Sequence, residues 1–214
     1  MHISDMASTT PSPASRILEI AATLPEGTPL SARSLLHLGS RVAIDQALSR
    51  LARSGALLRA GRGLYVRPVR ARFGVRSPAS ATVLARLAEQ TGEIIVSQGA
   101  AAANALGLTT QVPVREMYLT SGRTRKLQLG AQTIELRHAP RWQLAGHQAG
   151  EAVRALHWLG PIHGASGIAR LAKNLRKPDV RELLSLRSRL PNWLAREVSA
   201  LAEDVDGEIE GVEG

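Results

Sequence analysis

Two glycines set close together in the stretch ALLRAGRGLYVRP, residues 56–68, restrict the fold of this chain more than any other feature of its sequence. Short apolar runs flank them on both sides, as in a pair of short strands. Gly61 and Gly63 permit the positive φ values of a tight hairpin, and Pro68 ends the second strand. The stretch therefore predicts a β-hairpin that carries two arginines, Arg59 and Arg62.

The residues before this hairpin have the apolar spacing of three helices. The first covers residues 17–24 and ends at Pro25. Ser31 is placed to cap a short second helix, and Ser40 to cap a longer third helix that runs to Gly55. Apolar residues recur every three or four positions along the third helix and predict its buried face: Ile44, Ala47, Leu48 and Leu51.

Three helices followed by a basic hairpin are the outline of a winged helix-turn-helix, a DNA-binding fold. Its third helix would enter the major groove, where Arg and Gln bond base edges, and its hairpin would contact phosphates or the minor groove. The candidate DNA-binding residues lie at the helix starts, on the exposed face of the third helix and on the hairpin: Ser31, Ser40, Arg41, Gln46, Ser49, Arg50, Arg53, Arg59 and Arg62. The alternative is a small helical domain with a solvated basic face.

Asp45 stands among these candidates, although a carboxylate repels phosphate. It has three possible partners: Arg41 one turn earlier, Ser49 one turn later, or a cytosine amine of bound DNA. The sequence alone leaves the three open.

The composition favours a globular protein with an aliphatic core. Of the 214 residues, 44% are hydrophobic and only six are aromatic. The absence of cysteine excludes disulfides and thiolate metal sites. Because no apolar run is as long as a membrane span, we expect a soluble cytoplasmic protein with no membrane partner.

The charge distribution favours a polyanionic partner. The net charge is +9, but residues 203–214 hold six acidic residues and no basic one. Residues 1–202 therefore carry 27 basic against 12 acidic groups, a net charge of +15. A high-GC coding bias would explain arginine in place of lysine but not the positive excess. Neutralising phosphates with such residues releases counterions and drives nucleic-acid binding.

Beyond residue 77 the pattern mixes strands and helices. An apolar strand over 93–97 and an Ala-rich helix come first. Three strand-like runs follow, at 114–121, 125–130 and 132–139, and they predict an antiparallel meander. The remainder is helical. We expect an α+β fold in four segments: a disordered tail (1–13), a winged helix-turn-helix (14–72), an α+β domain (73–202) and an acidic disordered tail (203–214).

A second basic patch is predicted in the α+β domain. The turn SGRTRK, residues 121–126, concentrates three basic residues, and two more lie at the end of the third strand-like run: Arg123, Arg125, Lys126, Arg137 and Arg141. Such a patch would bind nucleic acid or an acidic protein surface. The alternative is a solvated turn.

The sequence shows no catalytic motif. It lacks the phosphate-binding loops G-x-x-x-x-G-K-[ST] and G-x-G-x-x-G, and also G-x-S-x-G and H-E-x-x-H. Its six histidines are scattered, without carboxylates at metal-ligand spacing. We expect no enzyme activity, no metal and no cofactor. A nuclease, the rival interpretation, would have to assemble its carboxylates from distant positions.

Several stretches in order resemble AbiEi-type antitoxins, the antitoxin halves of type IV abortive-infection toxin–antitoxin pairs. They are LSARSLLHLGSRVAIDQALSRLARSGALLRAGRGLYVRP, EMYLTSGRTRKLQLGAQTIELRHAP, AGEAVRALHWLG and LPNWLA. The resemblance covers about residues 15–200, and its second stretch is the more diagnostic. It implies an N-terminal winged helix that represses its own operon at an inverted repeat. It also implies a C-terminal domain that counters a cognate nucleotidyltransferase-like toxin.

The toxin's own glycine-serine and paired-aspartate motif is missing from this chain, which agrees with the antitoxin role. The main alternative is an ordinary winged-helix transcription regulator whose second domain dimerises or binds a ligand. A neighbouring reading frame for such a toxin would distinguish the two.

Overall fold

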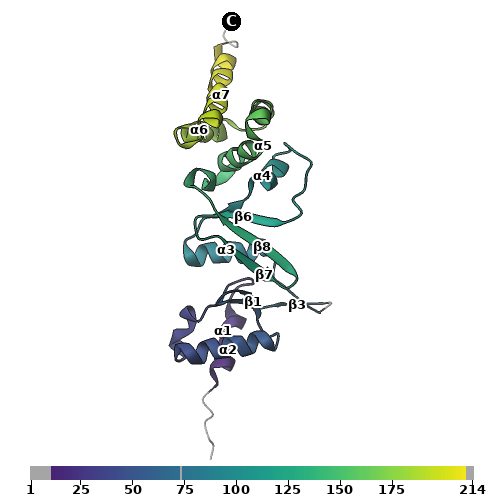
Figure 1. The fold of residues 1–214 in the computed structure, drawn as a ribbon, viewed down its shortest axis with the longest axis vertical. Helices are drawn as coiled ribbons and strands as arrows, with labels where there is room; N and C mark the ends of the chain where they lie inside the picture. Colours follow the sequence, from purple (N-terminus) through teal and green to yellow (C-terminus); the bar gives the residue numbers. More distant parts are fainter. Residues whose placement is uncertain (1–10, 73, 211–214) are drawn as a thin grey trace, which may run out of the picture. The chain divides into compact units, whose positions relative to one another are not determined.

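The computed structural model describes residues 11–72 and 74–210, with side chains for 11–72 and 74–201. The chain has an α+β fold and divides into two compact units (Figure 1). The first unit comprises Met1–Gly92 and Lys126–Thr133, and the second comprises Glu93–Arg125 and Ile134–Gly214. The sequence pattern placed the division between residues 72 and 73, well before this point.

Helix α3 (Ser80–Thr91) explains the later division, because it packs within the first unit. Its apolar side is buried, and Gln90 donates a hydrogen bond from Nε2 to the carbonyl oxygen of Pro29 over 3.1 Å. Gly27 approaches the helix so closely that a Cβ there would lie 3.0 Å from Thr82. These contacts join residues far apart in sequence, so no local change of composition marks them.

Three helical segments build the core of the first unit: α1 (Pro13–Thr23), η1 (Arg33–Leu38) and α2 (Arg41–Arg53). The hydroxyl of Ser12 accepts a hydrogen bond from the backbone N–H of Ser15, and Pro13 occupies the first turn of α1. The expected disordered tail over 1–13 was therefore wrong at residues 12 and 13, and its residues 1–10 lie outside the described part. The largest fully buried side chains of this core are those of Ile17, Leu35, Ile44, Leu48 and Leu57.

The predicted hairpin is confirmed as β1 (Leu58–Gly61) paired antiparallel with β2 (Leu64–Val66). Two backbone hydrogen bonds between Leu30 and Tyr65, of 2.7 and 2.9 Å, attach the segment before η1 to its free edge. Gly63 has the expected positive φ of 67°, but Gly61 does not. A Cβ at Gly61 would instead lie 3.4 Å from Leu127 of the hairpin tip at residues 126–133.

The stretch that follows, for which the sequence pattern predicted no helix or strand, is a second hairpin. Strands β3 (Val69–Ala71) and β4 (Gly74–Arg76) pair antiparallel as a two-stranded sheet of their own. Apart from Val69, which is half-buried, every residue of these strands is exposed. Without a buried face, the pair has no alternating apolar pattern that a sequence could display.

The four strands of the second half do not form the predicted meander. They are β5 (Ile95–Ser97), β6 (Glu116–Thr120), β7 (Arg125–Leu129) and β8 (Gln132–His138), in the sheet order β5-β6-β8-β7. Strand β6 pairs parallel with β8, with Thr120 opposite His138. The turn after β6 holds the end of β8, since His138 donates its backbone N–H to Thr124 Oγ1 and Ala139 donates to the Thr120 carbonyl oxygen. Strand β8 therefore takes the place beside β6 that a meander gives to β7.

Helices build the rest of the second unit: α4 (Gly99–Ala105), α5 (His147–Ala172), α6 (Lys177–Leu186) and α7 (Asn192–Glu210), with short turns η2 (Arg141–Leu144) and η3 (Arg187–Arg189). Helix α5 is kinked at Gly160, where φ is 73°, immediately before Pro161. Leucines from α5, α6 and α7 and alanines from α4 and α5 form the core. Among the described residues, no helix has the length and apolar character needed to cross a membrane.

The acidic C-terminal segment is helical where it is described. Helix α7 buries Leu194, Val198 and Leu201 and continues to Glu210, so the expected disordered tail over 203–214 was wrong for 203–210. Residues 211–214 lie outside the described part. Extending an established helix costs little compared with starting one, and glutamate is a good helix former.

Small residues allow α4 and α5 to pack closely, which gives a test of the core. A Cβ at Gly99 would lie 2.6 Å from both the Arg154 carbonyl oxygen and Trp158 Cβ. We expect Gly99→Ala to lower the free energy of unfolding by about 1–3 kcal/mol, because backbone must move to admit the methyl group. Gly146→Ala is the control, since nothing lies within 4 Å of its Cβ position and its φ is −74°. Equal urea midpoints for the two variants would contradict this packing.

Candidate nucleic-acid interface

The outward face of α2 carries the candidate base-contacting side chains. Ser40 caps the helix as predicted, its hydroxyl accepting from the Ala43 N–H over 3.3 Å. The predicted apolar stripe is buried, with Ile44 and Leu48 at zero exposure. At about 100° per residue, the positions opposite that stripe form an exposed row: Val42, Gln46, Ser49 and Arg53. Arg41 and Arg50 flank this row on opposite sides.

Asp45 pairs with Arg41, one of the three partners that the sequence left open. Arg41 Nε donates to Asp45 Oδ2 over 2.8 Å, and both side chains are about half exposed. An exposed pair of this kind adds little stability. It does neutralise the one carboxylate of α2, and so reduces the repulsion of a phosphate backbone.

The remaining first-unit candidates lie on η1 and the hairpin. Ser31 does not cap a helix in the expected way, because η1 begins at Arg33 and its N-cap is Ala32. Its hydroxyl still accepts a hydrogen bond from the backbone N–H of Ser34 over 3.3 Å. On the hairpin, Arg59 is exposed opposite Tyr65, and Arg62 is exposed at the tip.

Arginine outnumbers acidic residues throughout this part of the chain. Residues 11–92 contain twelve arginines, no lysine and four acidic residues. Three of those carboxylates already pair with arginine: Asp45 with Arg41, Glu26 with Arg76, and Glu89 with Arg86. The excess positive charge is therefore not neutralised within the described residues.

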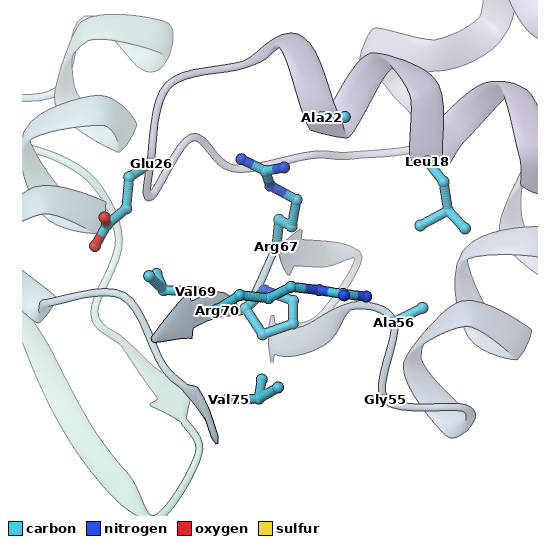
Figure 2. A pocket seen from close by; sticks show the side chains of 10 residues that line it. Leu18, Ala22, Glu26, Gly55, Ala56, Arg67, Val69, Arg70 and Val75 are labelled. Carbon is cyan, nitrogen blue, oxygen red and sulfur yellow. The ribbon is translucent and has the colours of Figure 1, made fainter. Parts of the chain in front are cut away.

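Two further arginines, missed by the sequence analysis, lie in a groove of the first unit. The groove has a volume of about 540 Å³ and lies between α1, the turn after α2 and the β3–β4 hairpin. Figure 2 shows the side chains of Arg67 and Arg70 extending into it, with Leu18 and Ala22 of α1 across from them. The sequence signal is the basic run VRPVRARFGVR, which has no regular apolar spacing.

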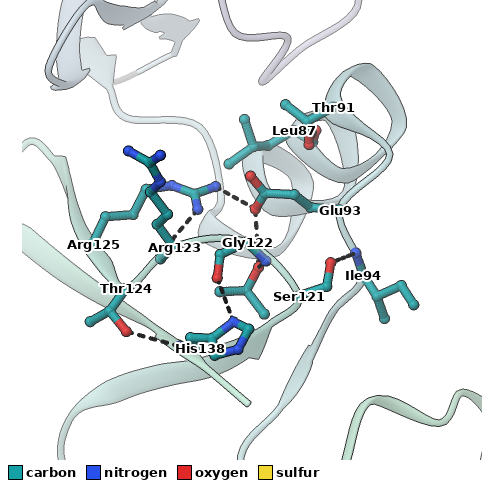
Figure 3. A network of polar contacts seen from close by, with 11 residues as sticks. Leu87, Thr91, Glu93, Ile94, Ser121, Gly122, Arg123, Thr124, Arg125 and His138 are labelled. Carbon is teal, nitrogen blue, oxygen red and sulfur yellow. Dashed lines mark hydrogen bonds and ion pairs between the residues drawn. The ribbon is translucent and has the colours of Figure 1, made fainter. Parts of the chain in front are cut away.

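The turn of the second predicted patch is held by a carboxylate (Figure 3). Arg125 Nη2 lies 2.7 Å from Glu93 Oε2, with both side chains about three-quarters buried. Thr120 Oγ1 donates to the same oxygen over 3.0 Å, and Arg125 Nη1 donates to the Arg123 carbonyl oxygen over 3.1 Å. Arg125 is thus a structural residue of the turn, whereas Arg123 and Lys126 near it are exposed.

The other members of that patch differ in their surroundings. Arg137 forms an ion pair with Glu135 on its own strand, with Nε and Oε1 3.2 Å apart. Arg141 is exposed on η2, and Lys126 is exposed directly after Arg125. Two of the five residues, Arg125 and Arg137, are therefore engaged by carboxylates. The sequence showed the charges but not the carboxylates that neutralise them.

The second unit contains one buried cation, which the sequence did not single out. Arg154 is 3% exposed, and burial lowers the pKa of its guanidinium, an effect that Glu151 opposes. Its Nη1 donates to the carbonyl oxygens of Gln143 and Ala145 over 3.1 and 2.7 Å. An open cavity of about 310 Å³ lies against it. His157 beside that cavity contacts Trp142 edge-on at 4.9 Å, and burial lowers the pKa of this histidine.

Over the described residues, no group of three or more His, Cys, Asp or Glu side chains could hold a metal ion. Both units thus offer cationic side chains rather than chelating groups. Guanidinium groups that are free of internal partners could bind anions.

Comparison with known proteins identifies a family. Residues 16–183 match the model of DUF6088, a family of unknown function, and the chain belongs to that family. No curated protein and no solved structure matches it significantly. The matched residues include parts of both units.

The Glu93–Arg125 pair predicts different effects for two neighbouring arginines. We expect Arg125→Ala to lower the free energy of unfolding by about 1–3 kcal/mol, because it leaves the Glu93 carboxylate without its charged hydrogen bond. Arg123→Ala should change it by less than about 0.5 kcal/mol, since the side chain is exposed. Chemical denaturation of the two variants measures the difference. Equal stability would show that the ion pair does not hold the turn.

Proposed function

We propose that this chain is the antitoxin of a type IV toxin–antitoxin pair, which represses its own operon by binding promoter DNA and neutralises a nucleotidyltransferase-like toxin. It would act by binding rather than by catalysis. The observation that carries the DNA-binding part is the exposed row on α2, which places Gln46 and Arg53 on the side opposite a fully buried stripe.

The order of elements supports a winged helix-turn-helix for the first unit. Helices α1 and η1, a turn and α2 precede the β1–β2 hairpin, and Leu30 adds a third strand-like bridge to that hairpin. In this interpretation α2 enters the major groove. Gln46 would bond an adenine edge, Arg53 a guanine edge, and Arg62 a phosphate near the hairpin tip. Binding to an inverted repeat would require two copies of the unit on one DNA.

The antitoxin part rests on the resemblance of the stretch EMYLTSGRTRKLQLGAQTIELRHAP to AbiEi-type antitoxins. This stretch includes β6, the turn held by Glu93, and the β7–β8 hairpin. The exposed Arg123 and Lys126 of the turn are available for an acidic partner surface, whereas Arg125 is occupied by Glu93.

An ordinary regulator whose second unit binds a ligand is the second candidate. The observation that favours it is the cavity beside Arg154, which also contacts Gln143 and Trp158. A buried guanidinium and an indole suit a small anion with an apolar body.

The DNA-binding proposal predicts a loss of sequence preference when the α2 face is changed. Gln46→Ala should reduce the preference for the chain's own promoter over random DNA by about 1–3 kcal/mol, because a bidentate base contact is removed. Fluorescence anisotropy with the two duplexes measures this preference. Gln111→Ala removes an exposed glutamine of the second unit and should leave the preference unchanged. An unchanged preference for Gln46→Ala would remove the base-contacting role of α2.

The antitoxin proposal predicts rescue of growth. Cells that express the nucleotidyltransferase-like toxin encoded beside this chain should grow when the full chain is co-expressed. Gln46→Ala should protect as well as the natural chain, because promoter binding and neutralisation are separate activities. If the folded chain binds its promoter but gives no protection, the ligand-binding regulator is the better interpretation.

A further inference from the structure

The groove of the first unit brings two arginine side chains into one cavity. Arg67 and Arg70 extend into it from either side of Pro68, and Figure 2 shows both side chains inside the cavity. Among the described residues, neither guanidinium has a hydrogen-bond or ion-pair partner. Glu26 is the one carboxylate of the wall, and it forms an ion pair with Arg76, with Oε1 and Nη2 3.5 Å apart.

The rest of the wall is apolar or open. Leu18 and Ala22 line one side, and Val75 lines the other although it is 67% exposed overall. A ligand that fits must therefore present negative charge to two arginines and a less polar surface to these side chains. A sugar–phosphate backbone has both, in a regular repeat. A compact inorganic anion would contact the arginines and leave the apolar wall unused.

The groove lies next to the C-terminal end of α2, and this position indicates which ligand it binds. Gly55 and Ala56, which line the groove, come directly after the C-terminal end of α2 and its Arg53. Nothing lies within 4 Å of a Cβ at Gly55, so the approach from the helix end is open. The exposed row of α2 is about 17 Å long from Val42 to Arg53 at 1.5 Å per residue. A DNA strand bordering a major groove that held this row would continue past Gly55 into the groove.

We propose that this groove holds the DNA backbone beside the site contacted by α2, with Arg67 and Arg70 each neutralising a phosphate. The β3–β4 hairpin would form its outer wall and carry Arg70 to the backbone. The inference rests on the proposed DNA-binding function. It adds a contact that carries affinity but no sequence preference, since phosphates are the same at every base pair.

The salt dependence of binding tests the proposal. The full chain is titrated onto a duplex from its own promoter and onto a random duplex of equal length, over a series of NaCl concentrations. For Arg67→Gln/Arg70→Gln, the slope of log K against log salt should fall by about 1.8 on both duplexes, at about 0.9 per phosphate contact. The preference for the promoter should stay within about twofold of the natural chain.

Arg187→Gln/Arg189→Gln is the matched control, because it removes the same charge from two exposed arginines of η3 in the second unit, outside the groove, and should leave the slope unchanged. Melting temperatures establish that both double variants fold. If the salt slope of the groove variant equals that of the natural chain, the proposed backbone contact is overturned, while the proposed α2 interface is unaffected. An equal loss in the control would also overturn it, since net charge alone would then explain the change. If the natural chain shows no salt-dependent binding to either duplex, the proposed DNA-binding function itself fails.

Discussion

The burial of one aliphatic stripe on α2 determines what the first unit can present to a partner. Ile44, Ala47 and Leu48 have no exposed surface, so the helix cannot rotate about its axis without moving them into water. The two large side chains among them, Ile44 and Leu48, each contribute about 1.5–3 kcal/mol when fully buried. The free energy needed to expose this stripe keeps the opposite row, from Val42 to Arg53, on the solvent side of the helix. The proposed DNA interface is thus a consequence of core packing.

Whether an arginine of this molecule is available to a partner depends on the groups that contact it. Arg125 belongs to a basic turn in the sequence, but its Nη2 lies 2.7 Å from Oε2 of Glu93, and both side chains are largely buried. Arg154 is buried without a carboxylate partner at ion-pair distance and relies on two carbonyl oxygens. Arg67 and Arg70 stand in an open groove with no partner among the described residues. Of these arginines, Arg67 and Arg70 can bind a phosphate without losing a contact inside the protein.

The α4–α5 contact of the second unit depends on the smallest side chains rather than the largest. Gly99 and the alanines around it let two helices approach until backbone nearly touches backbone. Few aromatic residues are needed to fill such a core, which agrees with a chain that has only six. Arg154 is buried in the same unit, and this burial lowers the pKa of its guanidinium.

The sequence by itself determined the features that depend on neighbours a few residues apart: the buried stripe and cap of α2, the β1–β2 hairpin, the α+β class and the excess of arginine. Tertiary structure decided the parallel pairing of β6 with β8, the place of α3 in the first unit, and which arginines are neutralised. The physical reason is distance along the chain. Helical phase and tight turns are properties of local backbone geometry, whereas Glu93 meets Arg125 only after the strands between them have folded. The β3–β4 hairpin escaped prediction for a related reason, because a ribbon exposed on both faces leaves no hydrophobic pattern.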